Sequence, residues 1–262
     1  MTAKIAVLIK QCPDTETKAQ INDSGLSEDG VKFILNPYDE YAIEEALLSK
    51  SKIAAESVSV FTVGPARATE ALRSALAMGC DDAYHVEVSD QEAKAFDSYL
   101  TAKTLSKALN KSGEYTCLFA GKQAIDDDSL AVPQMLAQFL DITHVSVVNK
   151  LSFEGEKNFK ANRSIEGGAE EIIEGSLPAL FSANKGLNKP RYASLPNIMK
   201  AKKKTINKLS LQDLGISTDM AKIQSSSFEL PPEKNAGVLW EGSSEELASK
   251  LVSALKNEAK VI

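Results

Sequence analysis

Apolar positions along the chain alternate between short continuous runs and segments of helical spacing. Mainly apolar runs are typical of strands buried on both faces, and they fall at residues 4–9, 58–63, 83–88 and 117–121. Apolar side chains three or four positions apart predict helices, which fall at residues 37–52, 66–78, 96–109 and 130–140. The connections between strands are long enough for right-handed crossovers. The pattern therefore predicts an α/β fold with a doubly wound, mostly parallel Rossmann-like sheet.

The pattern changes from about residue 142. Short strand-like pieces joined by glycine turns predict added antiparallel pairing at residues 145–151, 159–165, 171–174 and 177–183. Residues 184–204 contain prolines, a glycine and several bases with almost no helical periodicity, which indicates a functional loop rather than an idle connection. Residues 205–236 are irregular.

The last part of the chain carries a helix signal. Ser243 and Glu246 form a capping box before Leu247, Leu251 and Leu255 at helical spacing. This amphipathic helix either wraps a partner subunit or docks on the chain's own sheet. We accordingly divide the chain into an α/β domain at 1–183, a loop at 184–204, and an arm with its helix at 205–262.

The turn after residues 117–121 is the first candidate site. Gly121 breaks the strand, a polar turn carries Asp126, Asp127 and Asp128, and a predicted helix follows. This order gathers free backbone N–H groups beside the positive end of a helix dipole, at the sheet edge where ligands bind. A nucleotide phosphate suits that place. Aspartates are also ordinary helix caps in any turn of this kind, and both interpretations stay open.

A second helix start points to the same edge of the sheet. Asn36 is a good N-cap residue, Pro37 suits the first helical position, and Asp39 lies three residues after the cap. If both turns follow strands of one sheet, the two helix starts converge on one crevice.

Composition narrows the class of protein. The 262 residues, 43% hydrophobic and 25% charged, are those of an ordinary soluble globular protein. The net charge of −6 argues against general nucleic-acid binding, and no run approaches the roughly eighteen apolar residues of a membrane span. The N-terminal residues lack signal-peptide features, and Cys12, Cys80 and Cys117 form neither a disulfide framework nor a metal pattern. We expect a cytoplasmic protein.

No constellation of residues predicts catalysis by the chain itself. His85 and His144 lie far apart without a nucleophile beside them, and both are expected to be structural. The chain has neither a P-loop lysine motif nor a Gly-x-Gly-x-x-Gly motif. This suits a protein whose chemistry belongs to a cofactor. Two alternatives are a nucleotide enzyme that holds Mg²⁺ on the aspartate turn and a stand-alone nucleotide sensor.

Several runs match one protein family in the same order along the chain. They are residues 36–40 (NPYDE), 121–128 (GKQAIDDD), 163–168 (RSIEGG) and 188–204 (NKPRYASLPNIMKAKKK). With them the chain resembles the β subunits of electron transfer flavoproteins. The resemblance implies an obligate heterodimer with an α subunit that carries most of the FAD site. Such heterodimers accept electrons from acyl-CoA and related dehydrogenases of fatty acid β-oxidation and pass them to a membrane quinone oxidoreductase. In eukaryotes the compartment would be the mitochondrial matrix.

The resemblance also implies a structural AMP in the β subunit. Its expected contacts are Leu8, Asn36, Pro37, Tyr38, Asp39, Val63, Gly121, Lys122, Gln123, Ala124, Ile125, Asp126, Asp127, Asp128, Ser129, Leu130, Ala131 and Val132. Leu130, Ala131 and Val132, followed by Pro133, stand where the family commonly supplies Asn, Gln and Thr side chains to the phosphate. Only Ser129 and backbone groups remain, and losing two such hydrogen bonds costs about 1–3 kcal/mol.

One branch of the family binds a second FAD in place of AMP and bifurcates electrons. Its members usually carry glycine within the aspartate turn, so three unbroken aspartates favour the smaller nucleotide here. Tyr38 matches an aromatic position that approaches the flavin in the family. Ser164 stands where well-known members have an acidic residue associated with gating of the flavin domain.

Residues 184–204 match the recognition loop with which the family docks on dehydrogenases. A leucine in a proline-bracketed loop is by itself most often a packing plug, but by the resemblance Leu195 is the docking anchor. The expected docking residues are Arg191, Tyr192, Leu195, Pro196, Ile198, Met199, Lys200 and Lys203. The bases among them, with Lys202 and Lys204, form a basic cluster that would steer an acidic partner.

Overall fold

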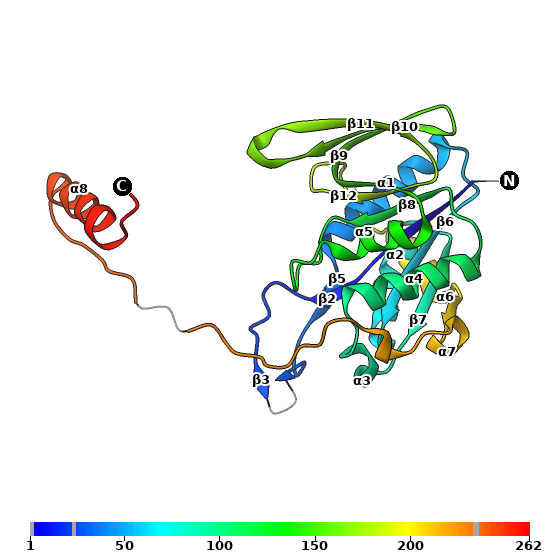
Figure 1. Cartoon of the computed structure of the whole chain (residues 1–262), viewed down its shortest axis with the longest axis horizontal. Coiled ribbons are helices and arrows are strands. Elements are labelled where there is room, and N and C mark those ends of the chain that lie inside the picture. The colour runs from blue at the N-terminus through cyan, green and yellow to red at the C-terminus, as the bar shows by residue number, and fades with distance from the viewer. Residues whose placement is uncertain (1–2, 23–24, 233–235) are drawn as a thin grey trace.

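The body of the protein is a mixed sheet. The computed structural model describes residues 3–22, 25–232 and 236–262. Its strands are β1 (Lys4–Leu8), β6 (Ser57–Gly64), β7 (Asp82–Glu87), β8 (Cys117–Gly121), β9 (Thr143–Glu154), β10 (Asn158–Ser164), β11 (Glu170–Ser176), β12 (Ala179–Ala183) and β13 (Ile206–Leu209). These form a nine-stranded sheet in the order β11-β10-β9-β12-β8-β1-β6-β7-β13 (Figure 1). Every neighbouring pair from β9 to β13 is parallel, which confirms the predicted α/β class.

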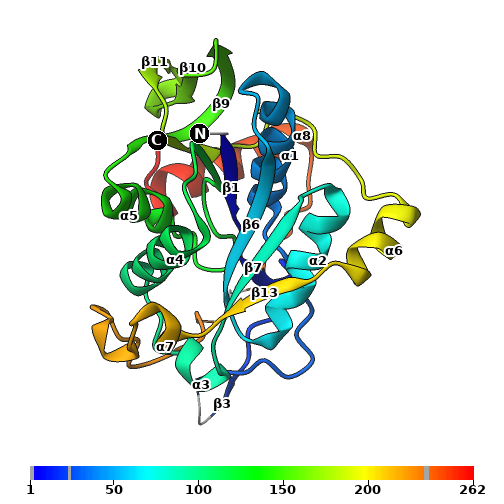
Figure 2. The same cartoon turned by 90° about the vertical axis from the view of Figure 1, so that its right-hand side faces the viewer.

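Helices cover both faces of the parallel strands (Figure 2). On one face lie α1 (Pro37–Lys52), α2 (Thr69–Met78) and α6 (Leu195–Lys203), and on the other α4 (Ser98–Ser112), α5 (Ala131–Leu140) and α7 (Leu211–Leu214). The layers explain the continuous apolar run of β1. Ile5 and Val7 pack in the core under α1 and α2, whereas Ala6 and Leu8 pack in the core under α4 and α5.

Short elements complete the connections. They are the strands β2 (Gln11–Pro13), β3 (Ile21–Asn22), β4 (Gly25–Leu26) and β5 (Phe33–Leu35), the helix α3 (Asp90–Ala93), and the 3-10 turns Ala66–Ala68, Glu166–Gly168 and Thr218–Met220. β2 pairs with β5 and β3 with β4, both antiparallel. Among the described helices, none combines the length and apolar character that a membrane crossing needs.

Two strands differ from the prediction. Antiparallel pairing is confirmed for β9, β10 and β11, but it is wrong for β12, which runs parallel to both β9 and β8. All residues of β12 are buried, and a short apolar run of this kind has the same pattern in either direction. β13 lies within residues 205–236, which were predicted to be irregular. Ile206 and Leu209 are only partly buried, so the strand has no clear apolar pattern.

The segment 184–204 contains a helix, α6, that the prediction of a loop excludes. Ser194 caps it, because its hydroxyl accepts the amide hydrogen of Asn197 at 3.4 Å, and Pro196 lies in its first turn. Ala201 is the buried residue of this helix. A helix that buries so little needs no apolar stripe, which is why helical periodicity does not reveal it.

The C-terminal arm leaves the body and ends in an isolated helix. Asp97 Oδ2 accepts the backbone N–H groups of Lys222 and Ile223 at 2.6 and 2.8 Å, which ties down the start of the arm. Beyond it, α8 (Ser244–Ser253) and the π-helical turn Ala254–Glu258 stand away from the sheet (Figure 1). The predicted capping box is confirmed. No residue of α8 is buried, so docking on the chain's own sheet is the wrong alternative.

Candidate functional site

The candidate site lies where the strand order reverses. From β1 the chain passes through α1 to β6 on one side, and through α4 it reaches β8 on the other side of β1. Open α/β sheets bind ligands at such a switch point, beyond the carboxyl ends of the strands. Leu8 and Gly121 end β1 and β8, and Val63 lies next to the end of β6. The predicted residues of three strand ends and two helix starts are therefore brought to one edge.

Asp39 fastens two of these strand ends to α1. Its Oδ2 accepts the backbone N–H of Lys10 at 2.7 Å, and its Oδ1 accepts that of Gly121 at 2.9 Å. Burial raises the pKa of the carboxyl to about 7, although hydrogen bonds from both amides and from Asn36 act in the opposite direction. The residue is only 4% exposed, so its carboxylate joins α1 to the ends of β1 and β8 below the surface. Its contact with a nucleotide stays a prediction.

Gly121 allows β8 to approach α1 closely. A Cβ atom at this position would lie 2.3 Å from Asp39 Oδ1 and 2.8 Å from the carbonyl carbon of Tyr38. Both distances are shorter than any ordinary carbon contact, and the Tyr38 atom belongs to the backbone. The glycine is therefore required by packing.

Asn36 occupies the N-cap position of α1 but does not cap it. Its side chain makes no capping hydrogen bond, and Nδ2 donates instead to the carbonyl oxygen of Gln123 at 2.9 Å. The predicted position is confirmed, and the predicted capping role is wrong. The residue is 2% exposed, and its Oδ1 is a buried acceptor without a hydrogen-bond partner. A donor on a bound ligand would satisfy this atom.

A lysine that follows β1 offsets part of the negative charge of the aspartate turn. Lys10 Nζ lies 2.7 Å from Asp126 Oδ1 and 3.5 Å from Asp127 Oδ2. Burial lowers the pKa of Lys10, but attraction by the two carboxylates outweighs it, so the pKa lies above its ordinary value. Asp128 in turn accepts a hydrogen bond from the Gln123 amide. Sequence patterns do not reveal Lys10, because it is 116 positions from Asp126.

The start of α5 offers few groups to a phosphate. Leu130 at the N-cap position has no side-chain acceptor, and Pro133 in the first turn has no N–H. Ser129 Oγ lies 3.3 Å from Ser98 Oγ and accepts the amide hydrogen of Ala131 at 3.4 Å. A phosphate here would depend on Ser129 and on first-turn amides, as the sequence predicts.

The apolar residues of α5 are only partly buried. Leu136 is fully buried, whereas Leu130, Met135 and Phe139 are each more than a third exposed. The predicted helix is confirmed. Helical spacing does not distinguish a side chain that faces the core from one that faces a free surface.

Tyr38 in the first turn of α1 and Lys122 directly after β8 lie close together. Lys122 Nζ is 5.1 Å from the centroid of the Tyr38 ring, within the range of a cation–π contact. The backbone N–H of Lys122 donates to the carbonyl oxygen of Ala183 at 2.9 Å, which continues the pairing of β8 with β12. The approach of Tyr38 to a flavin stays a prediction.

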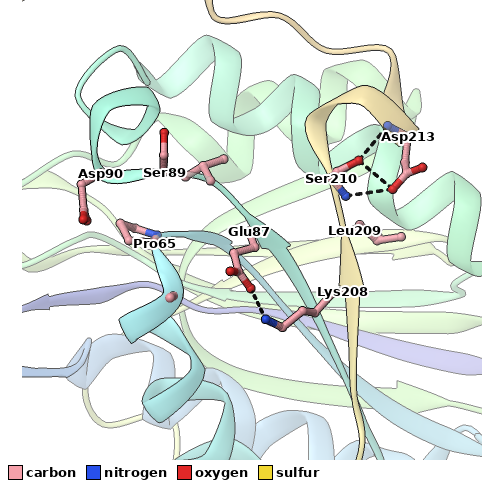
Figure 3. A pocket seen from close by; sticks show the side chains of 10 residues that line it. Pro65, Glu87, Ser89, Asp90, Lys208, Leu209, Ser210 and Asp213 are labelled. Atoms are coloured by element: carbon pink, nitrogen blue, oxygen red, sulfur yellow. Dashed lines mark hydrogen bonds and ion pairs between the residues drawn. The ribbon is translucent and has the colours of Figure 1, made fainter.

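A second hollow lies farther along the same edge (Figure 3). It has a volume of about 580 Å³ and is bordered by residues at the ends of β6, β7 and β13. Four of its polar side chains pair with one another: Glu87 with Lys208, and Ser210 with Asp213 at 2.7 Å. We assign no ligand to it. The sequence does not predict this hollow because β13 forms one of its walls.

The apolar residues of the predicted docking set are exposed on and just before α6. Tyr192 is 100% exposed, Leu195 73%, Met199 53% and Ile198 37%. The alternative in which Leu195 packs into the chain's own core is therefore wrong. Pro196 lies beside them and is exposed as well.

The basic cluster is smaller than the sequence predicts. Arg191 Nε lies 2.7 Å from Glu44 Oε2, and Lys204 donates to two backbone carbonyl oxygens at the end of α2. Both side chains therefore have partners from distant parts of the chain, and their contribution to docking stays a prediction. Lys200, Lys202 and Lys203 are exposed.

Both histidines make hydrogen bonds within the sheet. His85 Nε2 lies 2.9 Å from the carbonyl oxygen of Gly64, and His144 Nε2 lies 2.9 Å from Ser182 Oγ. Burial lowers the pKa of both, that of His144 to about 4 with a further contribution from Arg163. Within residues 3–22, 25–232 and 236–262, no group of three or more His, Cys, Asp or Glu residues is placed to hold a metal ion.

Known proteins match the chain over nearly its whole length. The electron transfer flavoprotein domain family matches residues 24–214. An "Electron transfer flavoprotein subunit beta" of Bacillus subtilis is 42% identical over 258 residues, covering 98% of each chain. A human protein of the same description is 40% identical over 250 residues, covering 95% of this chain and 96% of the relative. One from Thermoanaerobacterium thermosaccharolyticum is 39% identical over 260 residues, covering 97% and 98%. The matched lengths include α6 and the C-terminal arm.

Proposed function

Because the chain belongs to the electron transfer flavoprotein family and matches its β subunits, we propose that it works as an electron carrier in a heterodimer with an α subunit. The two subunits share an FAD, which supplies the redox chemistry. The donors are acyl-CoA and related dehydrogenases, and the acceptor is a membrane quinone oxidoreductase. The compartment is the cytoplasm, or the mitochondrial matrix in a eukaryote.

The crevice between β1 and β8 is our candidate for the AMP site. In support of this, Asn36 Oδ1 is a buried acceptor without a partner, and an adenine amino group is a donor of the right kind. The phosphate end is less well supplied, because Lys10 is already paired with Asp126 and α5 begins without side-chain donors. The residues fit an adenine nucleotide bound mainly by its base and by backbone groups. In this role the chain binds and orients a nucleotide and does not transform it.

The observation that carries the proposal is α6. A helix that presents Leu195 and Met199 to solvent, with exposed lysines behind them, is suited to brief contact with another protein. We propose that Leu195 enters an apolar pocket of the dehydrogenase and that Lys200, Lys202 and Lys203 steer an acidic partner surface. A stand-alone nucleotide enzyme or sensor has no use for such a surface.

Exposed apolar side chains on the C-terminal arm support the proposed heterodimer. Val238 and Leu239 are 76% and 96% exposed, and the apolar residues Leu251 and Val252 of α8 are 50% and 53% exposed. We propose that the α subunit covers this arm. Association with the α subunit would remove these apolar side chains from water, which favours the heterodimer.

The alternatives lead to different products on purification. The proposal expects a yellow heterodimer when the chain is co-expressed with an α subunit, and mass spectrometry of released nucleotides should find AMP with one FAD. Two FAD molecules per heterodimer would instead identify the bifurcating type. ATP turnover by the purified chain alone would favour the Mg²⁺-dependent enzyme and overturn the proposal.

Docking is tested by Leu195→Ala in the FAD-loaded heterodimer. Removing most of a buried leucine side chain costs about 1.5–3 kcal/mol, so the KM of a dehydrogenase for the heterodimer should rise roughly ten- to a hundredfold. Leu26→Ala, at a leucine 52% exposed on the distant β3–β4 pair, is the matched control and should leave KM unchanged. An unchanged KM in Leu195→Ala would remove the docking assignment.

A further inference from the structure

The segment before α6 is joined to α1 by a buried carboxylate. Arg191 Nε and Nη2 donate to the two oxygens of Glu44 at 2.7 and 2.8 Å, and the Arg191 backbone N–H donates to Glu44 Oε2 at 3.1 Å. Glu44 lies in the middle of α1 and is only 5% exposed. This is a two-pronged contact with a third hydrogen bond from the backbone, a geometry that fixes orientation as well as distance.

A neighbouring contact strengthens the same junction. Asn188 Nδ2 donates to the Tyr41 carbonyl oxygen at 2.9 Å and to Glu45 Oε2 at 3.1 Å. Burial raises the pKa of the Glu44 carboxyl, but the hydrogen bonds and charge of Arg191 outweigh it, so the pKa is lowered. Glu44 is therefore charged at neutral pH and attracts Arg191.

The other end of α6 is held by α2. Arg73 donates to the carbonyl oxygens of Ala201 and Lys204 at 2.6 and 2.5 Å, which satisfies groups that a helix end leaves free. Lys204 Nζ donates in return to the carbonyl oxygens of Cys80 and Asp81 at 2.7 and 3.0 Å. The segment is thus tied down on both sides of the residues that it exposes.

Between the two ties, α6 packs beside α2 but buries little of its own surface. The helix has nine residues, and Ala201 is the one that is buried. Helices shorter than about 12–15 residues are marginal in water unless tertiary contacts hold them. Its order in the free protein therefore depends on the two ties together with its contact with α2.

We propose that the Glu44–Arg191 ion pair positions the docking surface: it holds α6 in the orientation in which Leu195 and its apolar neighbours meet the partner. Arg191 is then a positioning residue that acts through α6, and not a base that steers the partner. The inference rests on the proposed docking role of α6. It adds that the docking surface is prepared before the partner arrives.

Ordering α6 before the partner arrives changes the affinity of docking and not the rate of electron transfer in the docked complex. A surface ordered in advance loses less entropy when it docks, so its partner binds more tightly. Without the ion pair, the partner would have to order the segment itself. We expect the KM of the dehydrogenase for the heterodimer to rise roughly tenfold, which is about 1.4 kcal/mol, with kcat at saturation unchanged.

The test is a double-mutant cycle of Glu44→Ala, Arg191→Ala and the double variant in the FAD-loaded heterodimer, with Arg191→Lys as the conservative variant. Amide hydrogen exchange over residues 192–200 is measured in parallel. Either single substitution should speed exchange there and raise KM, and the double variant should add little to either. Arg191→Lys, which keeps the charge but loses the two-pronged contact, should lie between the wild type and Arg191→Ala.

The control is Asp14→Ala, which breaks the ion pair of 2.7 Å between Asp14 and Lys32 in the N-terminal part of the chain. It should change neither exchange over 192–200 nor KM. Unchanged exchange in the Glu44 and Arg191 variants overturns the inference, and so does a cycle that couples in the unfolding temperature but not in KM. If Leu195→Ala also leaves KM unchanged, the docking proposal itself has failed. If only Leu195→Ala raises KM, the inference alone is wrong.

Discussion

Replacing Gly121 by alanine tests how closely β8 and α1 approach at the crevice. The added Cβ would lie 2.3 Å from Asp39 Oδ1 and 2.8 Å from both the carbonyl carbon and the Cβ of Tyr38. The carboxylate has no free space, because its two oxygens accept the amides of Lys10 and Gly121. The substitution therefore forces either the start of α1 or the end of β8 to move.

The expected loss of stability follows from two costs. Inserting a methyl group into a packed site costs about 1–3 kcal/mol, and a hydrogen bond to a charged group contributes about 1.5–3 kcal/mol. Both costs arise if the Asp39 carboxylate is pushed off the Gly121 amide. We expect Gly121→Ala to lower the free energy of unfolding by about 2.5–6 kcal/mol, measured by urea denaturation followed by circular dichroism.

Gly64 provides a matched control, because it ends the parallel strand β6 at the same sheet edge. A Cβ there meets only the Ala68 Cβ, at 3.2 Å, so Gly64→Ala should cost less than about 1 kcal/mol. Equal losses in the two variants, or no loss in Gly121→Ala, would refute the close approach. Release of AMP by Gly121→Ala, and not by Gly64→Ala, would further support a nucleotide at this crevice.

Three further predictions concern Asp39, the exposed lysines of α6 and the C-terminal helix. Asp39 has a folded pKa of about 7 against an ordinary value of 3.8, so the native state alone holds the proton between these values and stability should fall as pH rises through this window. The fall between pH 4.5 and pH 7.5 is about 3 kcal/mol, and urea denaturation at these two pH values should find it in the wild type but not in Asp39→Asn. An equal change in both proteins would contradict the assigned burial. Replacing Lys200, Lys202 and Lys203 by glutamine should slow reduction of the heterodimer by a dehydrogenase in stopped-flow measurements at low salt and weaken the salt dependence of the rate. A wild-type reduction rate that does not depend on salt would contradict electrostatic steering. Truncation before Ser243 should change the unfolding free energy of the body by less than about 0.5 kcal/mol yet weaken binding of the α subunit in size-exclusion chromatography, whereas an intact heterodimer would argue against the arm as its interface.

The sequence by itself determined those strands and helices that the local spacing of apolar residues defines. The run at residues 117–121, the glycine that ends it and the helix after it are visible because a buried strand and an amphipathic helix each have a period of their own. The two helix starts at the crevice are visible for the same reason, since Pro37 and the aspartates are local signals. From these alone follow the α/β class and the sheet edge at which the two helices begin.

Only the tertiary structure decided which side chains meet. Lys10 with Asp126 and Glu44 with Arg191 are 116 and 147 positions apart, and no local period relates them. The tertiary structure also showed that Asp39 accepts the amides of Lys10 and Gly121 and that Arg191 pairs with Glu44, while the expected ligand and partner contacts of these two residues stay predictions. It decided as well that β12 is parallel, that β13 extends the sheet, and that α6 is a helix, because each depends on a neighbour supplied by a distant part of the chain. Local periodicity reports how one segment is buried, whereas register, pairing and charge compensation are properties of two segments at once.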